Sequence, residues 1–250
     1  MKRILGIIPS RLESSRLPKK PLHEIFGLPL IAHVYKRASM SKMLTDLIVA
    51  TDSTEIVALV EAHGGKAMLT DINHKNGTER MAEVIAKYPD YDYYTLINGD
   101  EILLNPASID VSIQTLLDNE YADASILAVP FTRENSASDF KIVYNLKNEV
   151  MYISRNDIPS AARNAVEHRL KAYHLMTFKP KTILDYSKME KTPLEKIEDH
   201  EHLRLLEHGY KILCKVVHDN CISLDMPTDI PIIEAYLKED ETYQLYAGKI

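Results

Sequence analysis

Short apolar runs alternate with amphipathic stretches along the first half of the chain, a pattern typical of a mostly parallel sheet built from βαβ units. The apolar runs predict strands near residues 4–9, 46–51, 66–70, 93–98 and 124–129. The stretches between them predict helices at 29–43, from Ser53 onward and at 78–87, where apolar residues recur at helical spacing. We therefore expect an α/β fold in which helices cover both faces of a mostly parallel central sheet.

The alternation of apolar and amphipathic stretches changes after residue 130. Strand-like runs at 140–144 and 149–153 flank a turn-rich connection, which predicts a hairpin. Extended runs follow at 172–178 and 211–217, and helical patterns at 193–208 and 227–237. Pro231 should kink the last helix or mark its start. The sequence shows neither repeats nor a linker, so we expect one domain over residues 1–250, with residues about 130–190 as an inserted lobe that extends the sheet in antiparallel fashion.

The charge balance argues against a broad cationic surface. The 250 residues include 30 Lys and Arg against 36 Asp and Glu, a net charge of −6, so a general duplex-binding role has little support. Cys214 and Cys221 are the two cysteines, which favours a reducing compartment over a disulfide framework. The apolar run at 4–9 is too short for a signal core or a membrane span. We expect a cytoplasmic protein with no nucleic-acid or membrane partner.

The loop after the first predicted strand concentrates positive charge. Its charged and hydroxyl-bearing residues are Arg11, Glu13, Ser14, Ser15, Arg16, Lys19 and Lys20. Ligands of open α/β sheets bind at the carboxyl ends of strands, so this loop is suited to phosphate, although a solvated basic loop is the commoner fate of a charge run. The eight glycines form neither G-x-G-x-x-G nor G-x-x-x-x-G-K-[ST], which favours a nucleotidyltransferase loop over dinucleotide binding or Walker-type hydrolysis.

Two aspartates follow extended runs elsewhere in the chain. Asp100 stands in an Asn-Gly break after the strand at 93–98, and Asp225 lies between an extended run and a helix. Carboxylate oxygens there can hold a hard divalent cation beside a triphosphate. Taken singly, each acid is better explained as a cap for the turn or helix that follows it. Together, they are candidates for one metal site.

These segments together resemble the sugar-activating cytidylyltransferases, most closely the 3-deoxy-manno-octulosonate (Kdo) cytidylyltransferases. The resemblance covers most of the chain, and its first segments are the most specific. It is carried by Ile7-Ile8-Pro9-Ser10-Arg11, Ser15-Arg16-Leu17-Pro18, Lys20-Pro21-Leu22, His74-Lys75-Asn76-Gly77-Thr78-Glu79-Arg80, Gly99-Asp100-Glu101, Ser154-Arg155, Ile158-Pro159, Pro193-Leu194-Glu195, Leu203-Arg204 and Asp225-Met226-Pro227.

The resemblance implies a reaction in which the anomeric hydroxyl of the sugar acid attacks the α-phosphate of CTP and pyrophosphate leaves. It implies that Mg²⁺ is bound by Asp100 and Asp225, which act in catalysis with Arg11 and Lys20. It also implies nucleotide binding by Arg11, Ser14, Lys20, Asn76, Gly77 and Arg80. Such reactions are catalysed by positioning and charge neutralisation, and a metal-bound hydroxyl has a lowered pKa, so no residue is assigned as a base.

The departures from the family pattern concentrate on the acceptor side. The expected sugar-binding residues are Asn98, Arg155, His174, Phe178, Glu201 and His202. Asn98, Phe178 and His202 replace the usual Gln, Tyr and Gln of the family, so hydrogen bonding to the exocyclic end of the acceptor should differ. One hypothesis is an 8-amino-3,8-dideoxy-manno-octulosonate acceptor, with Glu201 as the ammonium partner. Neutral drift in a Kdo enzyme is the equally weighted alternative.

Other functions remain open at this stage. A synthetase for a nine-carbon nonulosonate related to sialic acid is the alternative enzyme, and a nonenzymatic nucleotide-binding module with the same fold is the alternative outside catalysis. The resemblance also implies a role in lipopolysaccharide biosynthesis and a homodimer formed through the lobe at 130–190, which would also bind sugar.

Two acidic or histidine-rich motifs carry little weight. Asp90 and Asp92 spell D-x-D, but they precede the predicted strand at 93–98. His200 and His202 are two apart on an expected helix, where they could not face one metal ion.

Overall fold

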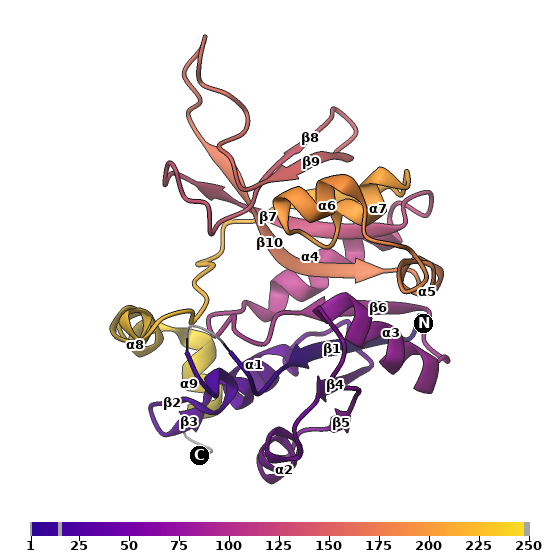
Figure 1. The fold of residues 1–250 in the computed structure, drawn as a ribbon. Helices are drawn as coiled ribbons and strands as arrows, with labels where there is room; N and C mark the ends of the chain where they lie inside the picture. Colours follow the sequence, from indigo (N-terminus) through magenta and orange to yellow (C-terminus); the bar gives the residue numbers. More distant parts are fainter. Residues whose placement is uncertain (1, 15–16, 248–250) are drawn as a thin grey trace.

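The computed structural model describes residues 2–14 and 17–247 of the chain (Figure 1). The strands in this part are β1 (Ile4–Ser10), β2 (Glu24–Ile25), β3 (Leu28–Pro29), β4 (Asp46–Thr51), β5 (Ala67–Leu69), β6 (Tyr93–Ile97), β7 (Ala124–Phe131), β8 (Lys141–Tyr144), β9 (Val150–Ser154), β10 (Arg169–Phe178) and β11 (Ile212–Val216). The helices are η1 (Lys20–Leu22), α1 (Leu30–Ala38), α2 (Thr54–Ala62), α3 (Gly77–Lys87), α4 (Pro106–Leu117), α5 (Pro180–Tyr186), α6 (Pro193–Glu198), α7 (Leu203–Glu207), η2 (Pro227–Asp229), α8 (Ile230–Glu239) and α9 (Glu241–Ala247).

One central sheet runs through the described residues in the order β11-β7-β10-β6-β1-β4-β5. β1 pairs in parallel with β4 and β6, β4 with β5, and β7 with β11. β10 is antiparallel to both neighbours, β6 and β7, and the β8–β9 hairpin joins the sheet through β10. The expected α/β class is confirmed: the sheet is mostly parallel and carries an antiparallel extension.

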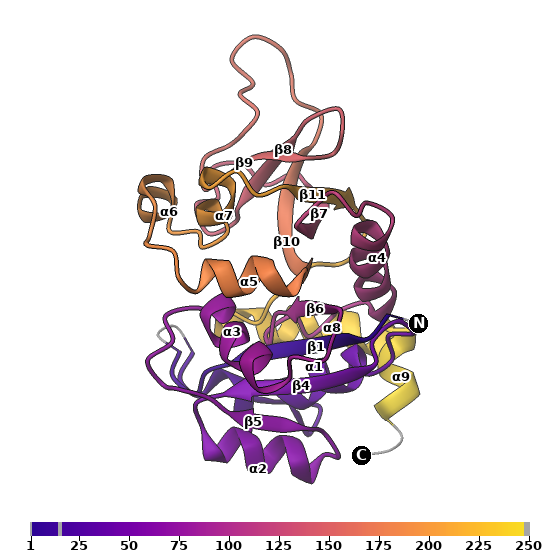
Figure 2. The ribbon, with the colours of Figure 1, turned by 90° about the vertical axis from the view of Figure 1, so that its right-hand side faces the viewer.

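Alternation along β1 sends side chains to two cores. Ile4 and Ile8 pack with helices α1, α2, α4 and α8 on one face. Leu5 and Ile7 pack with α3, α5 and α7 on the other. Figure 2 shows α3 and α5 lying side by side on this second face. Because both faces of the sheet are covered, ligands can reach it only at strand ends, as in other open α/β folds.

The helix expected over 193–208 is wrong as one element. The chain forms α6 and α7 instead, and Asp199 ends α6 in the left-handed conformation at φ 51°. Buried Arg204 of α7 donates to both carboxylate oxygens of Glu195 in α6, at 2.7 and 2.6 Å. This pair fixes the turn at 199–202 between the helices. Pro231 lies in the first turn of α8 and marks its start rather than a kink.

The last two helices are anchored on α1. Arg37 of α1, with 2% of its side chain exposed, pairs with Asp240 at 2.8 Å. His33, also on α1, bonds the Tyr246 hydroxyl and the Ile25 carbonyl, each at 2.8 Å. The last two helices therefore pack against α1. None of the helices among the described residues has the length and apolar character needed to cross a membrane.

Candidate active site

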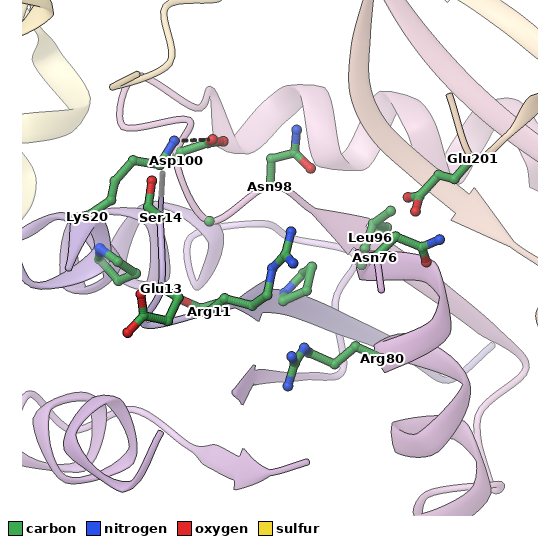
Figure 3. Close-up of a pocket in the computed structure, with 15 residues that line it drawn as sticks. Arg11, Glu13, Ser14, Lys20, Asn76, Arg80, Leu96, Asn98, Asp100 and Glu201 are labelled. Atoms are coloured by element: carbon green, nitrogen blue, oxygen red, sulfur yellow. Dashed lines mark hydrogen bonds and ion pairs between the residues drawn. The ribbon is translucent and has the colours of Figure 1, made fainter. Parts of the chain in front are cut away.

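A cavity of about 650 Å³ opens where β1 and β6 end (Figure 3). Its floor needs close packing of backbone, and Gly99 allows it, because a Cβ there would lie 3.0 Å from the Pro9 carbonyl oxygen. A Cβ on Gly77, at the start of α3, would lie 3.1 Å from the Pro9 ring. These glycines bring the loop after β6 and the first turn of α3 against the end of β1.

Lys20 joins the two predicted metal-binding acids at one end of this cavity. Its Nζ lies 2.7 Å from Asp100 Oδ2 and 3.2 Å from Asp225 Oδ1, although Asp225 is 205 residues away in the sequence. Burial opposes the charged form of Lys20, but the attraction of both carboxylates outweighs it and raises the pKa. The cation and the two distant acids thus converge on one point.

The same geometry tests whether a divalent ion fits. Asp100 and Asp225 already hold one ammonium group between them, so both carboxylates can reach a single cation, and carboxylate oxygens are ligands that Mg²⁺ prefers. Within residues 2–14 and 17–247, no group of three His, Cys, Asp or Glu side chains could hold a metal by itself. Two carboxylates suit a Mg²⁺ ion whose other ligands are water and phosphate oxygens.

The loop after β1 lines the cavity beside this cluster. Figure 3 shows Arg11 reaching into the space between Lys20 and Glu201, with Ser14 near Lys20. Ser10 Oγ, which sequence reasoning passed over, is buried against the cavity and has no hydrogen-bond partner among the described residues. Lys19 points elsewhere and pairs with exposed Glu55 at 3.1 Å. Ser15 and Arg16 lie outside the described residues.

The residues predicted to hold the nucleoside are placed at the start of α3. Asn76 caps this helix by accepting from the Glu79 backbone N–H at 2.8 Å, and it lines the cavity together with Gly77. Arg80 also borders the cavity, but its guanidinium is 1% exposed and pairs with Asp52 at 3.0 Å. The structure therefore brings all three predicted residues to the site.

Asp52 is a residue that sequence reasoning missed. Its other carboxylate oxygen accepts the Leu12 backbone N–H at 3.2 Å, so Asp52 connects Arg80 to the loop after β1. The available signal was its position directly after β4, whose carboxyl end lies at the same edge of the sheet as that of β1.

A second cavity, of about 250 Å³, shares lining residues with the first. Four of the predicted sugar-binding residues line it: Asn98, His174, Glu201 and His202. Lys75, Lys191 and His200, none of them predicted to bind sugar, line it as well. The premise that His200 and His202 share a helix is wrong, because both lie in the turn between α6 and α7, with ring centroids 5.3 Å apart.

The remaining two predicted sugar-binding residues are not among those that line this cavity. Phe178 is fully buried on β10, and its ring lies 6.0 Å from that of His202. Arg155 packs over Phe140 at 4.3 Å, and its Nε donates to the Glu198 carbonyl at 2.8 Å. Both residues therefore support side chains of the cavity wall, since Phe140 and His202 do line it.

A short hydrogen-bond chain crosses the wall of the second cavity. Thr78 Oγ donates to Glu201 Oε1 at 2.8 Å, so its oxygen must accept from His202 Nε2 at 3.3 Å. This assigns the proton of His202 to Nε2 and leaves Nδ1 as an acceptor. Both His202 Nδ1 and Glu201 Oε2 are buried without a partner among the described residues.

Burial shifts the titration of this wall toward neutral forms. Removal from water lowers the pKa of His202 to about 3 and that of His174 to about 4, because the charged imidazolium loses its hydration. It raises the pKa of Glu201 to about 7, although the bond from Thr78 opposes the shift. His174 Nε2 and His200 Nε2 lie 2.9 Å apart, a hydrogen bond that two neutral rings can share.

Glu101, next to Asp100, turns away from the cavity. It is 5% exposed and accepts a hydrogen bond from Ser223 Oγ at 2.9 Å. Burial and the nearby Asp100 charge raise its pKa to about 7. Asp90 and Asp92 lie at the opposite end of β6, where Asp92 accepts from the Arg3 backbone N–H at 2.7 Å, so the D-x-D motif has no part in this site.

Known proteins match the chain over nearly its full length. A family model described as cytidylyltransferase matches residues 5–212. The 3-deoxy-manno-octulosonate cytidylyltransferase of Protochlamydia amoebophila is 35% identical over 250 residues, which cover 96% of each chain. Its counterpart in Fusobacterium nucleatum is 37% identical over 95% of this chain and 98% of its own.

A solved structure agrees with these relatives. CMP:2-keto-3-deoxy-manno-octonic acid synthetase, solved in complex with CTP, superposes with a TM-score of 0.91 at 30% identity and covers 95% of this chain and 99% of its own. A chain with this fold, this cluster of cation and acids and these relatives belongs to the 3-deoxy-manno-octulosonate cytidylyltransferase family.

Proposed function

We propose that the protein transfers the cytidylyl group of CTP to a 3-deoxy-manno-octulosonate-type sugar acid. The anomeric hydroxyl oxygen forms a bond to the α-phosphorus, the bond from that phosphorus to the β-phosphate oxygen breaks, and pyrophosphate and a proton are released with the CMP-sugar. The product would serve lipopolysaccharide biosynthesis. One observation carries the proposal: Lys20, Asp100 and Asp225 meet at one end of a cavity whose other end leads to the cavity beside Glu201.

Charge neutralisation is the main contribution of the chain at the phosphate end. Arg11 and Lys20 are cations that line the cavity, and Ser14 adds a hydroxyl donor. Positive groups fixed around a triphosphate stabilise the charge that develops as pyrophosphate leaves. Asn76, Gly77 and Arg80 would hold the cytidine, and Arg80 would also keep the phosphate loop in place through Asp52.

Magnesium is the proposed cofactor. Asp100 and Asp225 would hold the ion, and their shared contact with the Lys20 ammonium supports that assignment. When bound, Mg²⁺ supplies Lewis-acid polarisation of phosphate oxygens. Lys20, once displaced from the acids, is long and flexible enough to contact a phosphate instead.

The acceptor end supports a specific second candidate within this function. Glu201 Oε2 and His202 Nδ1 are buried acceptors that find no donor among the described residues. An acceptor sugar that brings a donor-rich group, such as the ammonium of the 8-amino sugar, would satisfy them, whereas a hydroxyl can donate only once. Kdo and its 8-amino analogue are therefore the two acceptors to compare.

Pyrophosphate release tests the proposal directly. The purified chain is incubated with CTP and with Kdo, its 8-amino analogue or a nine-carbon nonulosonate, in Mg²⁺ or in chelator, and the product is identified by mass. We expect release only when CTP, a sugar acid and Mg²⁺ are all present. A product mass for a CMP-nonulosonate would redirect the acceptor assignment, and CTP binding without turnover on any acceptor would favour a nonenzymatic module.

A homodimer and a cytoplasmic location also stay predictions. Leu146 at the tip of the β8–β9 hairpin is fully exposed and Met151 on β9 is 65% exposed, which supports contact with a second copy through this hairpin. Light scattering on the purified chain measures the mass. The change of Leu146 and Met151 to Ser should shift a dimer toward monomer if the hairpin forms the interface.

A further inference from the structure

Asp225 lies near the end of an irregular connection. Residues 217–226, all of them described, link β11 to η2 and form neither helix nor strand. In Figure 1 this segment runs as a thread from the upper part of the sheet to α8. A segment without a hydrogen-bonded ladder does not fix its own register. Other contacts must hold Asp225 next to Lys20.

Glu101 supplies the upstream contacts. Ser223 Oγ donates to Glu101 Oε1 at 2.9 Å, and Cys221 Sγ lies 3.8 Å from each carboxylate oxygen. The Leu224 backbone N–H donates to the Asp100 carbonyl at 3.1 Å, which ties the same segment to the same turn. The two residues before Asp225 are thus bound to Asp100 and Glu101.

Asp229 supplies the downstream contacts. Its Oδ2 accepts from the backbone N–H groups of Asp225 and Met226, at 2.8 and 2.7 Å. This bond shapes the turn into η2, but it lies on the same segment as Asp225 and cannot place that segment against the rest of the site. At the start of the segment, Val217 bonds Ala128 of β7 and Asp219 bonds Asn105 and Ser108. Next to Asp225, contacts to another part of the fold are made with the turn of Asp100 and Glu101 and with Lys20.

We propose that Glu101 is a positioning residue that sets Asp225 at the distance at which it shares a cation with Asp100. The proposal rests on the proposed function for its link to CTP and metal. Consecutive acids of one turn then have different tasks: Asp100 contacts the shared cation, and Glu101 holds the segment that brings the second acid. Among the described residues, those lining the two cavities do not include Glu101, so it acts through Ser223 rather than on the substrate.

A buried carboxylate suits this task. A carboxyl oxygen accepts a hydrogen bond from a hydroxyl whether or not the group is ionised, and the burial of Glu101 leaves few competing water molecules. Loss of the donor also leaves Glu101 Oε1 without its 2.9 Å partner in a dry environment, which loosens the segment further.

Removal of the Ser223 hydroxyl is the first test. In Ser223→Ala, hydrogen exchange of the ligand-free chain should speed up at the amides of residues 222–226 by about tenfold, because the bond that closes this part of the segment onto Glu101 is lost. Exchange in β1 and β6 should not change. Ser39→Ala is the matched control, since the hydroxyl of exposed Ser39 donates to the Lys36 carbonyl at the end of α1.

Calorimetric titration with CTP distinguishes a loss of Asp225 positioning from a general loss of CTP binding. For Ser223→Ala, we expect CTP affinity in Mg²⁺ to fall about tenfold and CTP affinity in chelator to stay as in the wild type. Glu101→Gln, which keeps an oxygen acceptor for Ser223, should show a smaller loss than Ser223→Ala. Glu101→Ala should show at least as large a loss if it folds.

Three outcomes would overturn the proposal. Unchanged exchange at 222–226 in Ser223→Ala would show that the bond to Glu101 does not hold this part of the segment. An equal loss of CTP affinity with and without Mg²⁺ would show a purely structural role. A Glu101→Gln variant as defective as Asp100→Asn, with normal exchange, would make Glu101 a metal ligand. If the wild type binds CTP without any need for Mg²⁺, the metal assignment fails, and exchange alone then tests the positioning by Glu101.

Discussion

The two ends of the site manage charge in opposite ways. At the phosphate end, Lys20 stays charged between Asp100 and Asp225, and the acids raise its pKa. At the acceptor end, burial drives His202 and Glu201 toward their neutral forms, and polar atoms remain without partners among the described residues.

This contrast follows from what each end must bind. At the phosphate end, Lys20 and the two acids neutralise one another before ligands bind. A triphosphate can then replace the acids as the partner of Lys20, and a divalent ion can replace Lys20 as the partner of the acids. A sugar is distinguished by hydrogen bonds, and a buried acceptor without a donor penalises any ligand that fails to supply one. We expect substitutions at the phosphate end to reduce turnover and substitutions at the acceptor end to change selectivity and pH response.

Asp100→Asn should have the largest effect. The change keeps the shape of the side chain but removes the charge that attracts Lys20 and would hold Mg²⁺, so kcat should fall by about 1,000-fold or more. Steady-state pyrophosphate release measures it, and far-ultraviolet circular dichroism checks the fold. Asp90→Asn, at the other end of β6, should remain within about twofold of the wild type. Substantial activity in Asp100→Asn would contradict the expectation that substitutions at the phosphate end mainly reduce turnover.

Lys20→Met should reduce kcat/KM by roughly 100-fold, the usual consequence of removing one fixed positive donor from a developing negative charge. The neighbouring Lys19→Met serves as control, because Lys19 pairs with exposed Glu55 outside the cavity. The control should match the wild type in the same assay. Similar losses in both variants would mean that the loop contributes diffuse charge rather than one positioned cation.

His202→Gln should alter the pH dependence of stability. The pKa of His202 is about 3 in the folded chain and about 6.5 in an unfolded one. As the pH falls below 6.5, His202 is therefore protonated in the unfolded chain while it stays neutral in the folded chain. Between pH 7 and pH 5 this costs the folded state about 2 kcal/mol. Urea unfolding at both pH values should show that His202→Gln loses about this much less stability than the wild type.

A matched histidine variant controls for composition. His208→Gln changes an exposed residue at the end of α7, and its difference in unfolding free energy between pH 7 and pH 5 should equal that of the wild type. If the free-energy difference between pH 7 and pH 5 in His202→Gln also equals that of the wild type, His202 is protonated equally in the folded and unfolded states. The conclusion that burial keeps His202 neutral would then be wrong.

Glu201→Gln should have the smallest effect and the most selective one. The amide still accepts from Thr78 but presents a different set of donors and acceptors to the second cavity, so KM for the sugar should rise by about tenfold while KM for CTP stays within about twofold. Any preference for an amine-bearing acceptor should disappear. Exposed Glu190→Gln is the control, and an equal rise in both KM values would show that Glu201 serves the nucleotide.

The sheet was predictable because its strands are short, buried and apolar on both sides. Helix α4 was not predicted, since Ser108 and Ser112 face the interior among its apolar residues, and Ser112 bonds Thr177 of β10. Buried serines erase the amphipathic pattern on which helix prediction depends. The break at Asp199 was missed because an aspartate tolerates the left-handed conformation without a glycine or proline to mark it.

The site also contains residues that could be predicted from the sequence and residues that could not. The loop after β1 and the motif at α3 are continuous in sequence, so their residues could be recognised together. Asp52 with Arg80, and Glu101 with Ser223, form pairs only after the chain has folded, because the partners lie on separate turns. His200 was dismissed on the basis of a helix that does not exist there.

The anchoring of α8 and α9 on α1 has a consequence for heat inactivation. Asp225 enters the site just ahead of α8, and the Arg37–Asp240 and His33–Tyr246 bonds help to tether those two helices to α1. Local opening of this terminal pair would withdraw one acid while the sheet stays intact. Catalysis should therefore fade on warming several degrees before the main calorimetric transition, and it should recover on cooling.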